Sequence, residues 1–174
     1  MLAGYLDVAT DEVVLTTERF GKAALAENPA LPRLEFNVSH SGDQGLLAVT
    51  PRLRVGVDVE KHGRAVNLAA VAESTFTHYE THTWRSVPEE GTVQGFFDTW
   101  VLKEAFVKAT GLGIGYGLRN FEVSIVGEPV LRSIHGNEEV AKGWTLVLLD
   151  SDAGYSSGLA VEGSDIGHLT FEIE

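Results

Sequence analysis

Cysteine is absent from this sequence of 174 residues. Without thiols there is no disulfide, no thiolate nucleophile and no sulfur ligand for zinc, so oxygen or imidazole must hold any metal ion. No apolar run approaches the ~20 residues that a membrane-spanning helix needs. The first residues also lack the basic and apolar segments of a secretory signal. These absences predict a cytoplasmic protein with no membrane partner.

Positive charge is also scarce. Lysine and arginine number 13 against 25 aspartates and glutamates, which gives a formal net charge of −12 at pH 7. Nonspecific binding to nucleic acids depends on basic residues that displace counterions from phosphates, so no nucleic-acid partner is expected. A phosphate-bearing ligand would need a divalent cation and a few lysines close to it, because exposed charges act within a Debye length of about 8 Å.

The rest of the composition is that of a globular protein, with 44% hydrophobic residues, 22% charged residues and 19 glycines. Segments with a period of two surround a block with helical periodicity, and this order favours the α+β class. The patterns predict helices at residues 2–6, 67–74, 79–84 and 92–110, and strands at 12–17, 34–39, 46–50, 54–60, 121–126, 144–149, 156–161 and 169–173. We expect the strands between residues 34 and 60 to form an antiparallel meander, after a loop at residues 21–32.

The segment Val55–Glu60 alternates valine with small or acidic residues. Because side chains alternate along a strand, Gly56, Asp58 and Glu60 share one face. Two carboxylates at this spacing can lean toward one Mg²⁺, and without a cation one of them would tend to hold a proton near neutral pH. A half-buried strand with its polar face in water has the same pattern, so the segment alone leaves both interpretations open.

Glu104 and Lys108 lie one helical turn apart, on the same stripe as Phe97 and Trp100. One interpretation is an ordinary ion pair between these two residues on a surface helix. Such a pair stabilises a helix by only ~0.3 kcal/mol. The large aromatic Trp100 on the same stripe indicates instead that the stripe is covered. With the strand carboxylates, the helix would then supply the third carboxylate and the lysine of one site.

Two further segments resemble known catalytic or nucleotide-binding motifs but do not meet their requirements. Ser39 and His40 are neighbours on a predicted strand and point to opposite faces, so the imidazole cannot act as base for the hydroxyl, and a serine hydrolase is excluded. Phosphate contact or ordinary turn capping remains for these two residues. The glycine-rich segment at residues 111–117 follows a helix, whereas nucleotide-binding loops precede one, so Gly111 is predicted to end the helix.

Together these segments resemble the 4′-phosphopantetheinyl transferase superfamily, in its larger monomeric, surfactin-synthetase-activating type. Four signature segments occur in the family's order, and similarity extends through Phe76, Glu80 and residues 108–113 to about residue 126. The signature segments are Phe20–Lys22, Phe36–Ser41, Val55–Glu60 and Trp100–Lys108. The resemblance implies transfer of 4′-phosphopantetheine from coenzyme A to a serine of an acyl or peptidyl carrier protein, with release of 3′,5′-ADP. It implies an α+β fold of antiparallel sheets and helices in two pseudo-symmetric halves.

The resemblance also implies a catalytic role for four residues. Asp58, Glu60 and Glu104 would hold Mg²⁺ as it bridges the diphosphate of coenzyme A. Glu104 would accept the proton of the carrier serine. Lys108 would pair with diphosphate oxygens as a point charge.

Five other residues would bind coenzyme A on the same grounds. Ser39 and His40 would contact phosphates, and Gly21, Lys22 and Ala23 would line the adenine side. The family has proline at the position of Ala23. Alanine in its place makes the loop looser but keeps the contacts that the backbone of the loop makes.

The chain is also short at its front by comparison with the family, which carries several dozen residues before the point that matches Leu2. Residues 1–53 would therefore be a partial first half, and residues 54–174 a complete second half with the metal site. Two alternatives stay open: a truncated relative that binds coenzyme A without catalysis, and an acidic metal-binding structural domain. Scattered bases such as Arg52, Arg54 or Lys103 are candidates for docking a carrier protein.

Overall fold

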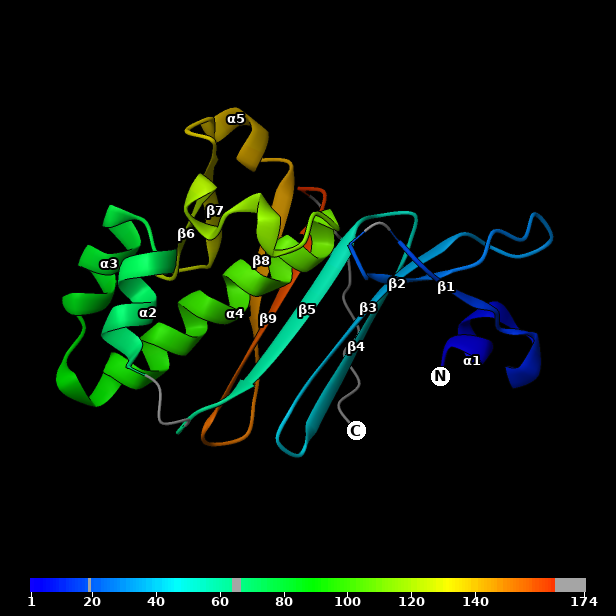
Figure 1. Cartoon of the computed structure of the whole chain (residues 1–174), viewed down its shortest axis with the longest axis horizontal. Helices are drawn as coiled ribbons and strands as arrows, with labels where there is room; N and C mark the ends of the chain where they lie inside the picture. Colours follow the sequence, from blue (N-terminus) through cyan, green and yellow to red (C-terminus); the bar gives the residue numbers. More distant parts are fainter. Residues whose placement is uncertain (19, 64–66, 165–174) are drawn as a thin grey trace.

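The computed structural model describes residues 1–18, 20–63 and 67–164, and it confirms the α+β class (Figure 1). The helices and strands are α1 (Leu2–Leu6), β1 (Leu15–Thr17), β2 (Ala23–Leu25), β3 (Leu34–Ser41), β4 (Gln44–Pro51), β5 (Val55–Lys61), α2 (Leu68–Thr75), α3 (His78–Arg85), α4 (Thr92–Thr110), β6 (Phe121–Ser124), β7 (Val130–Ile134), α5 (Glu138–Ala141), β8 (Trp144–Leu149) and β9 (Tyr155–Glu162). Among the helices of these described ranges, none combines the length and the apolar character that crossing a membrane requires.

A three-stranded antiparallel sheet in the order β5-β9-β8 lies at the centre. β5 pairs with β9 over its whole length, from Val55 opposite Val161 to Lys61 opposite Tyr155. β3 and β4 form a separate hairpin, as do β1 and β2 and, further on, β6 and β7. The predicted meander is therefore right for its first pair and wrong for its second, because β5 takes its backbone partner from the far end of the described chain.

The helix α4 lies across β5 and β9 in Figure 1. Two glycines allow this close approach. A Cβ atom at Gly56 would collide with the backbone of Ala105 and Ala109, and one at Gly158 would lie 3.0 Å from the carbonyl oxygen of Val101. Gly56 shares its strand face with Asp58, so the helix backbone is brought directly against the face that carries the carboxylates.

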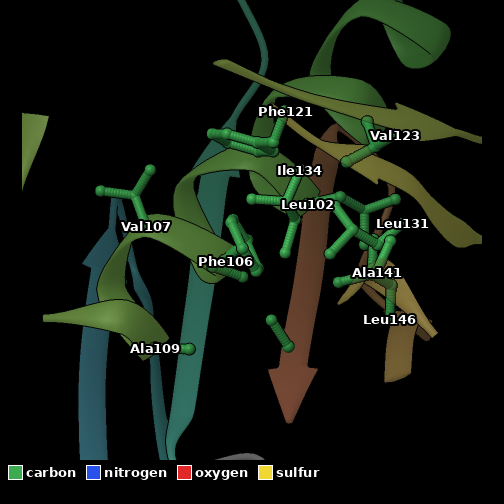
Figure 2. Packing of buried hydrophobic residues seen from close by; sticks show 12 residues of the cluster. Leu102, Phe106, Val107, Ala109, Phe121, Val123, Leu131, Ile134, Ala141 and Leu146 are labelled. Atoms are coloured by element: carbon green, nitrogen blue, oxygen red, sulfur yellow. The ribbon is translucent and has the colours of Figure 1, made fainter. Parts of the chain in front are cut away.

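Two apolar clusters surround α4 and fix its position. In Figure 2, Leu102 and Phe106 of the helix meet Phe121 of β6, Leu131 of β7 and other buried side chains. The second cluster joins α2, α3 and the first half of α4 through aromatic residues; it contains Ala72, Phe76, Trp84, Phe96 and Phe97. The helix is therefore buried around most of its circumference, and its end at Gly111 has the left-handed backbone (φ 67°) that glycine adopts freely.

Short elements depart most from the sequence-based expectations. The predicted strand at residues 12–17 is a 3-10 turn (Thr10–Glu12) followed by the three residues of β1, and the predicted loop at 21–32 contains β2. β7 and α5 were not predicted, and the strand expected at 169–173 falls outside the described residues. The division into residues 1–53 and 54–174 stays a prediction.

Candidate active site

The site lies where the hairpin β3–β4 meets the edge of the central sheet. β3 runs beside β5 in the same direction, since each hydrogen bond from a backbone amide of β5 to a side chain of β3 joins residues 20 apart in sequence. Backbone amides of β5 donate to side-chain oxygens of β3 in three places: Val57 to Asn37 (2.9 Å), Val59 to Ser39 (3.3 Å) and Lys61 to Ser41 (3.0 Å). Side chains thus occupy the edge that a neighbouring strand's backbone would occupy in an ordinary sheet.

Asp58 is the centre of the polar contacts at this edge. It is 5% exposed, and its Oδ1 accepts hydrogen bonds from Lys108 Nζ (2.7 Å) and Ser39 Oγ (2.9 Å). Lys108 Nζ also donates to Ser39 Oγ (2.9 Å) and to the carbonyl oxygen of Val57 (3.2 Å). Within the described residues, the ion pair of Lys108 is therefore with the strand carboxylate of Asp58, and the interpretation of an ordinary pair with Glu104 on a surface helix is wrong.

The second carboxylate oxygen of Asp58 is buried and has no hydrogen-bond partner among the residues that the structure describes. A buried polar atom without a partner is costly, because it has lost its water and gained nothing in exchange. A carboxylate oxygen is also the ligand type that Mg²⁺ prefers. The chemistry of Asp58 therefore fits a hard cation.

The surrounding charges strengthen this fit. Burial raises the pKa of Asp58, and the ammonium of Lys108 and the hydroxyl of Ser39 oppose that rise. Burial, followed by the negative charges of Asp58 and Glu60, also raises the pKa of Glu104. The negative charges of Asp58 and Glu60 thus disfavour the ionised form of Glu104, and a bound cation would relieve this repulsion.

The three predicted metal ligands are nevertheless not gathered into a ready site. Across residues 1–18, 20–63 and 67–164, no three acidic or histidine side chains are grouped closely enough to hold a metal ion. Glu60 is half-buried and its Oε2 accepts a hydrogen bond from Ser41 Oγ (3.1 Å). The structure brings Asp58 together with Lys108, whereas the complete ligand set of Asp58, Glu60 and Glu104 stays a prediction.

A cavity of about 410 Å³ opens beside Glu104 and Lys108. Gly21, Lys22 and Ala23 line the same cavity, and their role in binding coenzyme A stays a prediction. Lys22 Nζ donates to the carbonyl oxygen of Val55 (3.3 Å), and burial lowers the pKa of this lysine. Among the described residues the ammonium of Lys22 makes this one hydrogen bond, so it is well placed to serve an anionic ligand as well.

His40 lies apart from this cavity. Its side chain is exposed and lines a neighbouring cavity of about 600 Å³, together with Ser39, Val38 and residues of the first helix. The alternation of side chains along β3 is the reason, since Ser39 faces β5 and Asp58 while His40 faces away. Ser39 therefore belongs to the polar contacts around Asp58, and His40 does not.

The sequence-based prediction omitted two residues at the site and misplaced two bases. Asn37 and Ser41 contact β5, and the available signal was the polar residue at every second position of β3. Lys103 was considered for docking a carrier, but its side chain is fully buried and pairs with Glu80 (2.7 Å and 2.8 Å). Arg54 is likewise engaged, by two hydrogen bonds to Glu162 (2.9 Å and 2.7 Å).

Replacing Glu104 by glutamine is expected to raise the free energy of unfolding at about pH 8. The pKa of Glu104 is higher in the folded than in the unfolded protein, so the folded state holds the proton to higher pH. Its contribution to stability therefore falls as pH rises through the interval between the two pKa values. Urea unfolding at about pH 4 and pH 8 measures this difference. The advantage of the variant should shrink toward pH 4, and a variant less stable than wild type at pH 8 would contradict the electrostatic account.

Comparison with known proteins identifies similar chains. The family model described as the 4′-phosphopantetheinyl transferase superfamily matches residues 54–157. The human L-aminoadipate-semialdehyde dehydrogenase-phosphopantetheinyl transferase is 33% identical over 133 residues, which cover 72% of this chain and 43% of that protein. The 4′-phosphopantetheinyl transferase HetI of Nostoc sp. is 34% identical over 164 residues, covering 94% of this chain and 66% of HetI.

One more relative and one solved structure are also similar to this chain. The 4′-phosphopantetheinyl transferase psf-1 of Bacillus pumilus is 38% identical over 124 residues, 70% of this chain and 51% of that protein. A crystal structure of a holo-(acyl-carrier-protein) synthase from Bacillus anthracis in complex with coenzyme A aligns with 64% of this chain and 96% of its own, with 20% identity and a TM-score of 0.49. The chain thus spans 43% to 66% of the length of the three curated relatives named here. Because this family model matches residues 54–157, more than half of the chain, the chain belongs to the 4′-phosphopantetheinyl transferase superfamily.

Proposed function

We propose that this chain transfers 4′-phosphopantetheine from coenzyme A to a serine of an acyl or peptidyl carrier protein, in a Mg²⁺-dependent reaction. The observation that carries the proposal is the contact of Lys108 with the buried Asp58, beside the cavity that Glu104 and Lys22 line. Ammonium groups and a carboxylate suited to a hard cation are what a diphosphate ligand needs in a protein with a net charge of −12.

In this proposal Asp58, Glu60 and Glu104 hold Mg²⁺. The unpartnered oxygen of Asp58 and the mutual repulsion of Asp58 and Glu104 support the assignment. When bound, the ion would neutralise negative charge that develops on the diphosphate during transfer.

Glu104 and Lys108 have separate roles in the transfer reaction. The carrier serine oxygen forms a bond to the phosphorus attached to pantetheine, the bond from that phosphorus to the bridging diphosphate oxygen breaks, and 3′,5′-ADP leaves with the electron pair. Glu104 accepts the serine proton, and its raised pKa brings it nearer to the pH range in which a general base works best. Lys108 stabilises the charge on the diphosphate oxygens.

The cavity accounts for the binding of coenzyme A in the same proposal. Gly21, Lys22 and Ala23 line the adenine side, Ser39 contacts a phosphate beside Lys108, and His40 contacts one from the neighbouring cavity. The proposal keeps two further expectations: a fold of two pseudo-symmetric halves and a cytoplasmic location.

The Asp58→Asn variant is expected to lose at least about 100-fold in kcat/KM, because an amide neither neutralises Lys108 nor binds Mg²⁺ as a carboxylate does. Intact-mass analysis of an apo carrier protein incubated with coenzyme A and Mg²⁺ measures the transfer. The matched control is Asp43→Asn, which changes a carboxylate that is 93% exposed at the β3–β4 turn and should leave the transfer unchanged. Wild-type transfer by Asp58→Asn would refute the assigned site.

A coenzyme A-binding relative without transferase activity is the second candidate, since the described residues do not gather the three predicted metal ligands into one group. The same experiment separates the two candidates. Binding of coenzyme A by calorimetry with no added mass on the carrier protein would favour the second candidate. Equal binding of Mg²⁺ and coenzyme A by wild type and Asp58→Asn would favour an acidic structural domain instead.

A further inference from the structure

The contacts between β3 and β5 repeat with a period of two residues. Ser39 Oγ accepts from the amide of Val59 (3.3 Å) and donates to the carboxylate of Asp58 (2.9 Å). Two residues further on, Ser41 Oγ accepts from the amide of Lys61 (3.0 Å) and donates to the carboxylate of Glu60 (3.1 Å). Each serine therefore joins a backbone amide of β5 to the side chain of the preceding residue.

The two carboxylates differ in how many other groups hold them in place. Asp58 is held by Lys108 in addition to Ser39, whereas Ser41 supplies the only hydrogen bond that the described residues make to the carboxylate of Glu60. Glu60 is only half-buried and has one more rotatable bond than aspartate. Fixing its carboxylate in one orientation therefore costs more conformational entropy than fixing that of an aspartate. The hydroxyl of Ser41 is itself 3% exposed and is fixed by the amide of Lys61.

We propose that Ser41 is a positioning residue, which orients the carboxylate of Glu60 toward the metal ion and does not contact the reacting atoms. The inference rests on the proposed function, because it takes Glu60 as a metal ligand. Groups that hydrogen-bond to metal ligands fix their orientation, and loss of such a group costs roughly 10-fold to 100-fold in metal affinity.

Calorimetric titration of Mg²⁺ into the protein in the presence of coenzyme A tests the proposal. In Ser41→Ala, the dissociation constant for Mg²⁺ should rise roughly 10-fold while the KM for coenzyme A stays near that of wild type. Ser41→Cys keeps the side-chain volume and donates only weakly, so it should change the Mg²⁺ affinity in the same direction if alanine prevents folding. In a Glu60→Ala background, Ser41→Ala should cause no further loss, because the residue acts through the carboxylate of Glu60.

Ser124→Ala is the matched control. Ser124 is 6% exposed, and its hydroxyl also contacts a side chain and a backbone amide. It lies on β6, far along the chain from Glu60. It should leave the Mg²⁺ affinity unchanged. Wild-type affinity in both Ser41 variants, with binding lost in Asp58→Asn, would overturn the role of Ser41 and leave the proposed function intact. Unchanged affinity in Asp58→Asn as well would overturn both.

Discussion

A Lys103→Met variant is expected to lose about 3–5 kcal/mol of its free energy of unfolding, because it leaves the carboxylate of Glu80 buried without its countercharge. Both side chains of this ion pair are fully buried. The four hydrogen bonds to Glu80 come from Lys103 (2.7 Å and 2.8 Å) and from the amides of Val123 (2.8 Å) and Thr77 (2.7 Å). The pair therefore links α3, α4 and β6, and chemical unfolding in urea measures its loss.

The loss should depend on pH in a defined direction. Burial raises the pKa of Glu80, and without Lys103 this rise can only increase, since the ammonium opposed it. The variant can therefore neutralise Glu80 by taking up a proton, so its deficit should shrink as pH falls from about 8 to 5. The control is the double variant Glu80→Leu, Lys103→Met, in which no charge remains and much of the stability should return. A loss below about 1 kcal/mol in Lys103→Met would contradict this account.

A Gly56→Ala variant is expected to lose both stability and activity. The added methyl group would collide with backbone atoms of Ala105 and Ala109, which cannot rotate away as a side chain could. Overpacking of this kind costs roughly 3 kcal/mol or more when the backbone itself must move. The helix that moves carries Glu104 and Lys108, and a displacement of about 1 Å at a catalytic group reduces the rate on the order of 100-fold.

Gly95→Ala is the matched control, since Gly95 lies on α4, the helix that packs against Gly56. A Cβ atom there would lie 3.7 Å or more from its neighbours, which is ordinary contact. Alanine is the better helix former by about 1 kcal/mol, so this variant should be slightly more stable than wild type and fully active. Thermal unfolding and the carrier-protein mass assay compare the two variants directly. Wild-type stability in Gly56→Ala would show that α4 does not rest on β5 as closely as described.

The local pattern was enough to predict the helix that carries Glu104. Its apolar residues recur at helical spacing, Gly111 ends it, and the bounds of α4 agree with the prediction at both ends. The strand with Asp58 was equally clear from the alternation after Val55, although β5 begins and ends one residue later than the predicted strand at 54–60. Long elements with a regular period are specified by nearby residues, and this is why both could be read from the sequence.

Contacts between distant segments could not be predicted in the same way. The pairing of β5 with β9 depends on the whole sheet, and nothing in the segment around Asp58 names that partner. The burial of Lys103 depends on α4 being covered on more than one side, so a lysine next to Glu104 was mistaken for a surface base. The close approach of the helix backbone to Gly56 likewise joins distant segments, and the pattern around Asp58 did not predict it.

The edge of β5 also bears on how this protein avoids aggregation. A strand at the edge of a sheet normally presents free amides, to which an extended segment of another molecule can add itself. Here the amides of Val57, Val59 and Lys61 are already bonded to side chains of β3. The arrangement that separates the two strands therefore also shields the edge of the central sheet from intermolecular β-pairing.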